Sequence, residues 1–434
     1  MKGTAALRRK IESRTANVAV IGQGYVGLSL ACEAAAAGFP ATGIDVDGGR
    51  IRELEGGGLS VPGVSEQVYR TALRAGLRFS TRPEAIREAQ IIAICVPTPR
   101  RDQSPDLSYV DAACRDIEPF LSPTSLVVLE STTYPGTTEE VVRPLLEKSG
   151  LLAGRDFLLA YSPERIDPGN AKFDFRSVPR LVGGLTPEAT GAACLFYTQI
   201  VDHVFPVSSC RAAEFAKLLE NTFRQVNIAL ANEMAIVCHE MSLDVWEIIE
   251  AAASKPFGFM RFDPGPGVGG HCIPVDSTYL AWHVRREAGH QFRILEQAED
   301  INCQMPAYVV SRIAEALNEA GKALKGARIL VLGITYKPDV ADVRESPALR
   351  VMSLLERRGA KVSYHDPHIP FVSRNGGASH RVPLSTRILG TSDCVALLVP
   401  HSAYDLAWIA QESKLVFDAR NGYGASARSN VVRL

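Results

Sequence analysis

"NVAVIGQGYVGLSLACEAAAAGFPATGIDVD", residues 17–47, is the stretch that decides the fold of this 434-residue chain. It opens with a short apolar run over 17–21, which is typical of a buried parallel strand. Three glycines follow as G-x-G-x-x-G, then an Ala-rich helical stretch that ends at Gly38, and then a second strand that ends in Asp45. This order is the fingerprint of a dinucleotide-binding unit: a strand, a glycine turn, a helix and a second strand that ends in an acid about 20 residues after the glycines.

Each position of the fingerprint has a physical task. Gly22 makes the tight turn, Gly24 lets the backbone approach a pyrophosphate, and Gly27 lets the helix pack closely on the strand. Tyr25 and Val26 lie between these glycines, at the helix N-terminus that faces the phosphates, and we count them with the cofactor-binding residues.

The charges beside the fingerprint favour NAD over NADP. Asp45 would accept hydrogen bonds from the ribose hydroxyls, and its charge would repel a 2′-phosphate. Arg50 tempers this preference, because a nearby arginine could accept that phosphate. The other interpretation of the glycines is a tight turn without a ligand.

Composition excludes several classes of protein. The net charge is −1, so the chain as a whole is neither a nucleic-acid binder nor a polybasic membrane binder. No apolar run approaches the roughly 20 residues that span a bilayer, and no apolar segment of a secretory signal follows the basic N-terminus. The nine cysteines form no C-x-x-C pair, which argues against a disulfide framework and a thiolate zinc site. We expect no metal, mostly buried reduced thiols, and a cytoplasmic location.

Polar residues follow three further strands of the first domain. These strands are expected within 89–99, 125–137 and 157–166. Thr98, Thr132 and Glu164 stand near their carboxyl ends, and those ends line the ligand crevice of a parallel sheet. We therefore expect Thr98 and Thr132 to face the cofactor. The first domain is expected over residues 1–205.

The middle region, 206–325, is expected to be all-α. Residues 207–255 hold no Gly or Pro, and apolar residues recur at helical spacing, which predicts one long helix or a pair. Lys217 and Asn221 are four residues apart and share one face. The pattern alone favours a solvated surface lysine at 217.

The same region contains "PGPGVGGHCIP", residues 264–274. The run ends by presenting Cys272 beside His271, with Asp276 four residues on. A thiol on a glycine loop can lie close to a substrate, and it is a nucleophile when a cation or base stabilises its thiolate. The other interpretation is an incidental buried thiol.

The third region, 326–434, repeats the plan of the first. Its order is strand, glycine, loop, helix, strand and Asp, but the first loop is ten residues longer and lacks the second and third fingerprint glycines. That loop holds Lys337 and Arg344, and Arg420 ends a later strand, which favours a phosphate or nucleotide site. The predicted fold is therefore α/β: two Rossmann-like domains joined by an all-α central domain with a long helix, with the ligands between them.

Eight motifs in order carry a family resemblance over about residues 16–425. They are "GQGYVG", "VPTP", "ESTTYPGT", "SPERIDPGN", "AAEFAKLLENTFRQVNIALANE", "PGPGVGGHCIPVD", "GITYKPDVADVRESPA" and "DARN". The chain resembles the UDP-glucose/GDP-mannose dehydrogenase family of NAD-dependent nucleotide-sugar 6-dehydrogenases. The resemblance implies oxidation of the sugar C6 alcohol to a carboxylate in two hydride transfers. The aldehyde is captured by Cys272 as a thiohemiacetal, which becomes a thioester that water hydrolyses.

The resemblance also implies residue roles. Lys217 stabilises oxyanions at C6, Asn221 holds the same oxygen, and Asp276 orients Lys217 or a water molecule. Thr132 and Glu164 position that water and serve in acid–base steps. The general base stays open among Glu164, Asp276 and Lys217.

Further residues are implied to bind the ligands. Lys337 and Arg420 contact the substrate diphosphate or sugar, Arg344 contacts the cofactor phosphates, and Gly269 belongs to the substrate-binding loop. The resemblance also implies a homodimer through the long central helix.

Two positions in the glycine loop differ from the UDP-glucose branch and leave the choice of sugar open. Val275 stands where enzymes of the UDP-glucose branch commonly have a lysine, and His271 precedes the cysteine as a loop-shaping or substrate-contacting residue. The loop is therefore closer to the UDP-N-acetylhexosamine branch. UDP-glucose, the commonest activity of the family, is nevertheless the first expectation, with UDP-N-acetylglucosamine or UDP-N-acetylmannosamine as the alternative. A two-electron β-hydroxyacid-type dehydrogenase and a non-catalytic nucleotide-sugar-binding or redox-sensing protein are the alternatives of other types.

Overall fold

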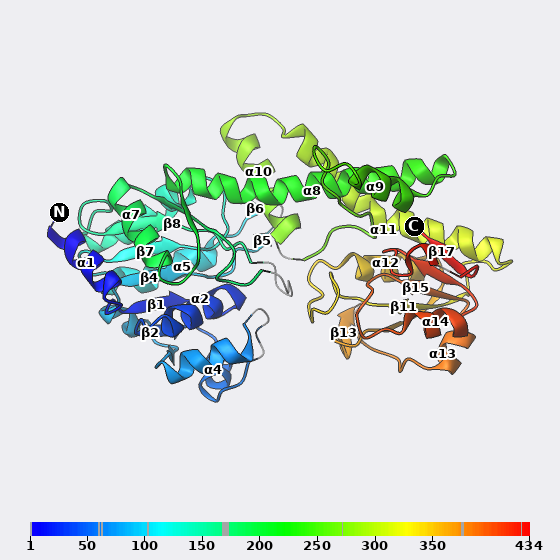
Figure 1. The fold of residues 1–434 in the computed structure, drawn as a ribbon, viewed down its shortest axis with the longest axis horizontal. Helices are drawn as coiled ribbons and strands as arrows, with labels where there is room; N and C mark the ends of the chain where they lie inside the picture. The colour runs from blue at the N-terminus through cyan, green and yellow to red at the C-terminus, as the bar shows by residue number, and fades with distance from the viewer. Residues whose placement is uncertain are drawn as a thin grey trace. The chain divides into compact units, whose positions relative to one another are not determined.

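The computed structural model describes residues 2–59, 61, 64–101, 104–166, 173–270, 272–374, 377–426 and 428–434. The chain forms two compact units, which Figure 1 shows as ribbons. The first contains Met1–Glu220 and Thr278–Ala288, and the second contains Asn221–Ser277 and Gly289–Leu434.

The first unit is built on an eight-stranded sheet in the order β10-β9-β8-β7-β4-β1-β2-β3. Its strands are β1 Val18–Ile21, β2 Ala41–Ile44, β3 Arg78–Ser80, β4 Ile91–Ile94, β7 Leu126–Leu129, β8 Leu158–Tyr161, β9 Arg180–Gly184 and β10 Val204–Pro206. All neighbours are parallel except β8 and β9, which are antiparallel. Helices lie on both faces, among them α2 Tyr25–Ala36, α5 Ser108–Ile117 and α7 Pro187–Tyr197. The order from β3 to β8 is that of a doubly wound dinucleotide-binding sheet, as the sequence predicts.

The glycine turn at the end of β1 is set by close contacts. Gly22 has a φ of +91°, and a Cβ built there would lie 2.6 Å from the Cys95 carbonyl oxygen. A Cβ on Gly27 would lie 1.8 Å from the Gly22 carbonyl oxygen. Both positions therefore exclude every other residue type, as expected for the turn and for helix–strand packing.

Helix α2 buries an acid, and this leads to a pH prediction. Glu33 is buried, and Arg176 Nη1 lies 3.8 Å from its Oε2. Burial raises the pKa of Glu33 to about 7, against the opposing effect of Arg176. The folded state therefore binds a proton more tightly than the unfolded chain, so stability falls as pH rises between the unfolded value, about 4.5, and the folded value.

We expect Glu33→Gln to remove this loss. Relative to the unchanged protein, the melting temperature of the variant should rise steadily from pH 4.5 to 7 and level off above it. The expected gain at pH 8 is at most about 3 kcal/mol. Calorimetry across this range is the measurement, with the exposed Glu12→Gln as control. A difference between variant and unchanged protein that does not change with pH would contradict the prediction.

The second unit contains a five-stranded parallel sheet in the order β12-β11-β15-β16-β17. Its strands are β11 Arg328–Leu332, β12 Lys361–His365, β15 Cys394–Leu397, β16 Val416–Asp418 and β17 Val431–Arg433, and helix α12 is Pro347–Arg357. The hairpin β13 Phe371–Arg374 and β14 Gly377–His380 and the helices α13 Thr386–Thr391 and α14 Leu406–Glu412 complete the domain.

The second sheet repeats the start of the first in atomic detail. Gly333 has a φ of +80°, and a Cβ there would lie 2.4 Å from the Val399 carbonyl oxygen, just as Gly22 meets a carbonyl after its neighbouring strand. Asp366 at the end of β12 accepts a 2.7 Å hydrogen bond from the Ile334 amide. Two Rossmann-like domains are thereby confirmed.

The intervening region is helical. Its helices are α8 Cys210–Glu240, α9 Val245–Ala253, α10 Cys272–Glu287 and α11 Arg293–Glu319. Helix α8 is one continuous helix of 31 residues rather than a pair (Figure 1). It exposes Phe215, Leu219, Phe223 and Leu230, each at 44% or more. The domain boundaries near 205 and 325 stay predictions.

Two composition-based expectations bear on the fold. None of the helices in the described residues is long and apolar enough to cross a membrane. The eight cysteines whose side chains are described are all free thiols, and six of them are buried: Cys32, Cys95, Cys114, Cys210, Cys238 and Cys394. Most cysteines thus act as small apolar core residues, as expected.

Candidate active site

The end of β1 is built to receive a dinucleotide. Gly24 is the N-cap of α2 and supplies no side-chain cap, so the first amides of the helix have no side-chain acceptor at that position. A Cβ on Gly24 would meet only the Arg50 guanidinium, at 4.0 Å, which leaves room for a pyrophosphate. Tyr25 and Val26 follow as the first, partly buried residues of the helix.

The acid after β2 is held in place. Asp45 Oδ2 accepts a 2.6 Å hydrogen bond from the Gln23 amide, and Oδ1 accepts one of 2.9 Å from the Asp47 amide. Arg50 donates to the Gln23 carbonyl at 3.2 Å and so lies beside the same turn. These residues fit NAD, which when bound supplies the hydride acceptor.

The loops after β4 and β7 meet within the first unit. The Thr98 hydroxyl donates to the Thr132 carbonyl oxygen at 2.7 Å, so the structure brings these two predicted residues together. The Tyr279 hydroxyl on α10 donates to the carbonyls of Thr98 and Pro99. The hydroxyl proton of Thr98 therefore forms a hydrogen bond that links the two loops.

Glu164, after β8, is anchored by three donors. Its Oε1 accepts 2.6 Å hydrogen bonds from the amides of Arg165 and Ile166, and its Oε2 accepts one of 2.9 Å from Arg180 Nη1. The carboxylate is 6% exposed. Glu164 is thus a rigidly placed carboxylate rather than a freely rotating one.

Arg180 joins Glu164 to a second buried acid. Its Nη2 donates to Glu130 Oε2 at 2.5 Å, and the Tyr197 hydroxyl donates to the other oxygen of Glu130. Burial raises the pKa of Glu130 to about 7, although the charge of Arg180 lowers it. Glu130, Arg180 and Tyr197 are not among the residues that the sequence predicts for the site. The sequence feature that could have pointed to this network is a charged residue at the end of an apolar strand, as in "VVLE" (127–130).

Helix α8 presents two predicted residues on its buried side. Lys217 is 7% exposed and Asn221 4%, so the interpretation of Lys217 as a solvated surface lysine is wrong. Within the part of the chain that the structure describes, no hydrogen bond or ion pair reaches the Lys217 ammonium. Asn221 Nδ2 donates to Asp276 Oδ2 on α10, which places these two predicted residues in direct contact.

In the second unit, the glycine loop packs on the lengthened loop of the third region. A Cβ on Gly269 would lie 2.9 Å from Tyr336 Cβ and 2.8 Å from the Glu345 carbonyl oxygen. The Gly270 amide donates to the Arg344 carbonyl at 3.1 Å. The structure therefore places Gly269 against the loop that carries Lys337.

Arg420 meets the same glycine loop from the end of β16. A Cβ on Gly265 would lie 2.5 Å from Arg420 Nη1, so only glycine leaves room for the guanidinium. Burial lowers the pKa of Arg420 to about 10, with Asp263 as the nearby charge that opposes it. A cation that burial has partly stripped of water is suited to bind an anionic ligand.

The loop is tied to the helices by a chain of amides. The Gly265 amide donates to Asn232 on α8 at 2.9 Å, Asn232 donates to Asn302 on α11 at 2.8 Å, and Asn302 donates to the Gln225 carbonyl at 3.1 Å. Asn232 and Asn302 are buried. These residues are absent from the sequence-based site, because no local pattern pairs side chains 70 residues apart.

Three predicted site residues either form a different contact or lie, in whole or in part, outside the described residues. Arg344 is exposed, and its guanidinium forms a two-pronged pair with Asp342, from Nε to Oδ1 at 3.1 Å and from Nη2 to Oδ2 at 2.6 Å. Cys272 is the first residue of α10, but its side chain lies outside the described part of the chain. His271 lies outside the described residues altogether. The expectation that the ligands bind between the two nucleotide-type domains stays a prediction.

Comparison with known proteins covers nearly the whole chain. Sequence models of the UDP-glucose/GDP-mannose dehydrogenase family match in three parts. These are the NAD binding domain at residues 16–201, the central domain at 211–304 and the UDP binding domain at 330–425.

Among individual proteins, a UDP-N-acetyl-D-mannosamine dehydrogenase from Methanococcus maripaludis is 34% identical over 421 residues, which are 93% of this chain and 92% of that protein. The structure of a UDP-D-ManNAc dehydrogenase from Pyrococcus horikoshii is similar with a TM-score of 0.87 and 31% identity, covering 96% of this chain and 98% of that one. A UDP-glucose dehydrogenase from Pyrobaculum islandicum is similar with a TM-score of 0.84 and 28% identity, covering 96% and 97%. The chain therefore belongs to the UDP-glucose/GDP-mannose dehydrogenase family of NAD-dependent nucleotide-sugar dehydrogenases.

Proposed function

We propose that this protein oxidises C6 of a UDP-N-acetylhexosamine, UDP-N-acetylmannosamine in the first place, from the alcohol to the carboxylate. The observation that carries the choice of sugar is the nearly full-length match to proteins of that activity. It favours the alternative over our first expectation, UDP-glucose. Val275, buried on α10 at the position of a lysine in the glucose branch, agrees with it.

The proposed chemistry removes four electrons from one carbon. The C6 alcohol first loses a hydride and a proton and becomes an aldehyde. The Cys272 thiolate then adds to that carbon, which forms a C–S bond and, with one proton, a thiohemiacetal. Loss of a second hydride and a proton leaves a thioester, and water cleaves its C–S bond to give the carboxylate and the free thiol. NAD, when bound, supplies the hydride acceptor, and one NAD would be reduced for each of the two hydrides.

The position of Cys272 in the fold supports its proposed role. It begins α10, and the N-terminus of a helix favours a thiolate. One turn further along the same helix, Asp276 accepts a hydrogen bond from Asn221. We propose that Lys217, one turn before Asn221 on α8, stabilises the oxyanion at C6 in both half-reactions.

The anchored carboxylate of Glu164 has a narrower role in this proposal. Arg180 and two backbone amides hold it, so we propose that it orients the hydrolytic water together with Thr132. The general base stays open among Glu164, Asp276 and Lys217. We propose that Lys337 and Arg420 bind the diphosphate or sugar and that Arg344 reaches the cofactor phosphates.

A panel of sugars tests the proposal. Purified protein with NAD is given UDP-N-acetylmannosamine, UDP-N-acetylglucosamine, UDP-glucose, GDP-mannose or dTDP-glucose, and NADH is counted per sugar consumed. We expect two NADH per sugar and the highest kcat/KM with UDP-N-acetylmannosamine. A higher kcat/KM with UDP-glucose would overturn the choice of sugar. One NADH per sugar would support the β-hydroxyacid-type alternative, and binding without turnover would support the non-catalytic one.

Two further expectations belong with this proposal. The row of exposed apolar residues on α8 is consistent with a homodimer through that helix, as the resemblance implies. The free thiols are consistent with a reducing cytoplasmic location.

A further inference from the structure

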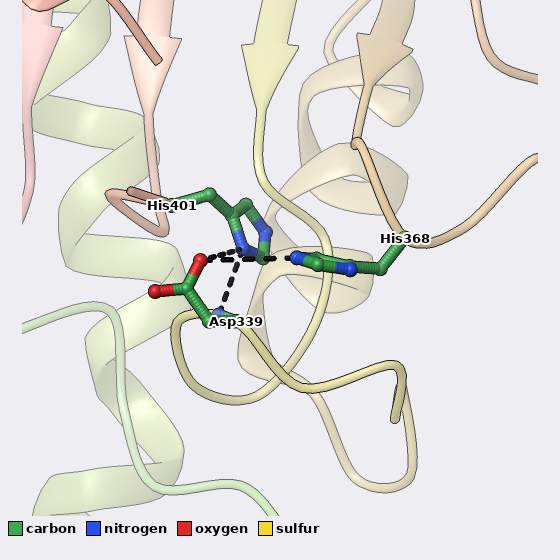
Figure 2. Close-up of side chains that lie close together, drawn as sticks. All are labelled: Asp339, His368 and His401. Carbon is green, nitrogen blue, oxygen red and sulfur yellow. Dashed lines mark hydrogen bonds and ion pairs between the residues drawn. The ribbon is translucent and has the colours of Figure 1, made fainter. Parts of the chain in front are cut away.

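His401 lies at the centre of a polar cluster in the second Rossmann-like domain. It follows β15, and its side chain is fully buried. Figure 2 shows its ring between Asp339, from the lengthened loop, and His368, from the segment after β12. The same loop carries Lys337.

One ring nitrogen of His401 faces the buried acid of the domain. Nε2 lies 3.0 Å from Asp366 Oδ2 and 3.2 Å from Thr335 Oγ1. Burial alone would raise the pKa of Asp366. Hydrogen bonds from His401 and from backbone amides nevertheless hold this pKa below its usual value. An ionised carboxylate only accepts, so Nε2 carries the ring proton and donates it to Asp366.

The other ring nitrogen holds the lengthened loop. The Asp339 amide donates to Nδ1 at 3.0 Å, and the Ser402 amide donates to the Asp339 carboxylate at 3.0 Å. Asp339 has a φ of +60°, a left-handed conformation that residues other than glycine adopt at a cost. One hydrogen bond donated to His401 and one accepted from Ser402 thus hold this strained residue in place.

A metal ion is the obvious alternative occupant of this cluster. Asp339, His368 and His401 each offer one ligand atom, and these atoms lie within 4.8 Å of one another. However, the lone pair of His401 Nδ1 already accepts the Asp339 amide, and Nε2 faces Asp366. A metal ligand needs a free lone pair, so the hydrogen bonds favour a structural role for this ring.

The contacts continue from His401 to the backbone of Lys337. Thr335 Oγ1, which lies 3.2 Å from His401 Nε2, donates to the Lys337 carbonyl at 3.0 Å. Lys337 therefore lies between two residues, Thr335 and Asp339, that both contact the same ring. We propose that His401 is a positioning residue that holds the loop 335–342 so that Lys337 meets the nucleotide sugar. The part that concerns the sugar rests on the proposed function.

Two substitutions test the roles of the two ring nitrogens separately. In His401→Asn, the amide oxygen can take the place of Nδ1 and accept the Asp339 amide. In His401→Gln, the amide nitrogen can take the place of Nε2 and donate to Asp366, but no atom replaces Nδ1. His380→Gln, on the exposed strand β14, is the matched control.

Hydrogen exchange measures the hold on the loop without any ligand. We expect the backbone amides of 335–342 to exchange about tenfold faster in His401→Gln than in the unchanged protein. In His401→Asn and in the control they should exchange at nearly the rate of the unchanged protein. In the activity assay, we expect His401→Gln to raise KM for the nucleotide sugar about tenfold, with KM for NAD unchanged, and His401→Asn to restore it.

The outcomes separate the two proposals. Equal exchange in all variants, or faster exchange with an unchanged KM for the sugar, would overturn the positioning role of His401. An equal rise of both KM values would also overturn it, because it would indicate a general loss of structure. If the unchanged protein turns over none of the sugars, the proposed function fails, while the exchange data still test the hold on the loop.

Discussion

Cys272→Ser is expected to bind the nucleotide sugar and NAD normally and to lose net oxidation to the carboxylate. A serine hydroxyl is a far weaker nucleophile than a thiolate at neutral pH, so the aldehyde carbon is no longer captured. We expect the rate of carboxylate formation to fall by at least about 10³-fold, because removing the nucleophile from a group of residues that act together can cost up to about 10⁶-fold in kcat. NADH yield, carboxylate yield and sugar binding by calorimetry are the measurements.

Cys303→Ser is the control for this experiment. Cys303 is a free thiol on α11 and is exposed, so its loss tests for a general effect of removing a thiol. We expect unchanged activity. Two NADH per sugar from Cys272→Ser at the normal rate would show that oxidation proceeds through the aldehyde hydrate, without a bond to this residue.

Arg180→Met is expected to cause the largest loss of stability. Arg180 is 2% exposed and is the shared partner of Glu130 and Glu164, so its removal leaves two buried carboxylates without their cation. Breaking a buried ion pair by removing one partner costs about 3–5 kcal/mol. We expect the melting temperature of the transition that involves the first domain to fall by roughly 10 °C at pH 8.

The pH dependence of this loss identifies its cause. Because burial already raises the pKa of Glu130 to about 7, the variant should protonate this acid as pH falls, and the deficit should shrink toward pH 5. Arg155→Met is the control, since Arg155 forms an exposed pair with Asp156 and its loss should change the melting temperature little. A loss as small as that of the control would contradict the structural role of Arg180.

The same variant also tests the proposed role of Glu164. Without Arg180, the carboxylate keeps two backbone donors among the described residues and should no longer hold one orientation. We expect the hydrolysis step to slow more than sugar binding weakens, so that kcat falls while KM for the sugar changes little. Arg180→Lys, which restores one charge without the two-pronged geometry, should recover stability more than activity.

Local patterns were sufficient for the parts of this protein whose cause lies within a few residues. The turn at Gly22 and Gly27 is set by contacts inside one strand–helix unit, so three glycines and an acid predict it. The continuous apolar runs of β1 and β4 predict strands buried on both faces, and each of their residues is buried. The one long helix follows from the absence of Gly and Pro, although the pattern left open whether it was one helix or two.

Side-chain partnerships far apart in the chain could not be predicted in the same way. Lys217 has the sequence context of a surface lysine, and only the packing around α8 buries it. Arg180 meets an acid 50 residues away and Arg420 a glycine 155 residues away, and neither distance leaves a local signature.

The sequence by itself determined the two Rossmann-like domains, the helical region between them, NAD as the cofactor and the family, because each depends on short periodic patterns and ordered motifs. Only the tertiary structure decided which polar groups meet: Asn221 with Asp276, Glu164 with Arg180, and His401 with the loop of Lys337. The physical reason is that a buried polar side chain must find a partner in space, and the fold, not the neighbouring residues, brings that partner to it.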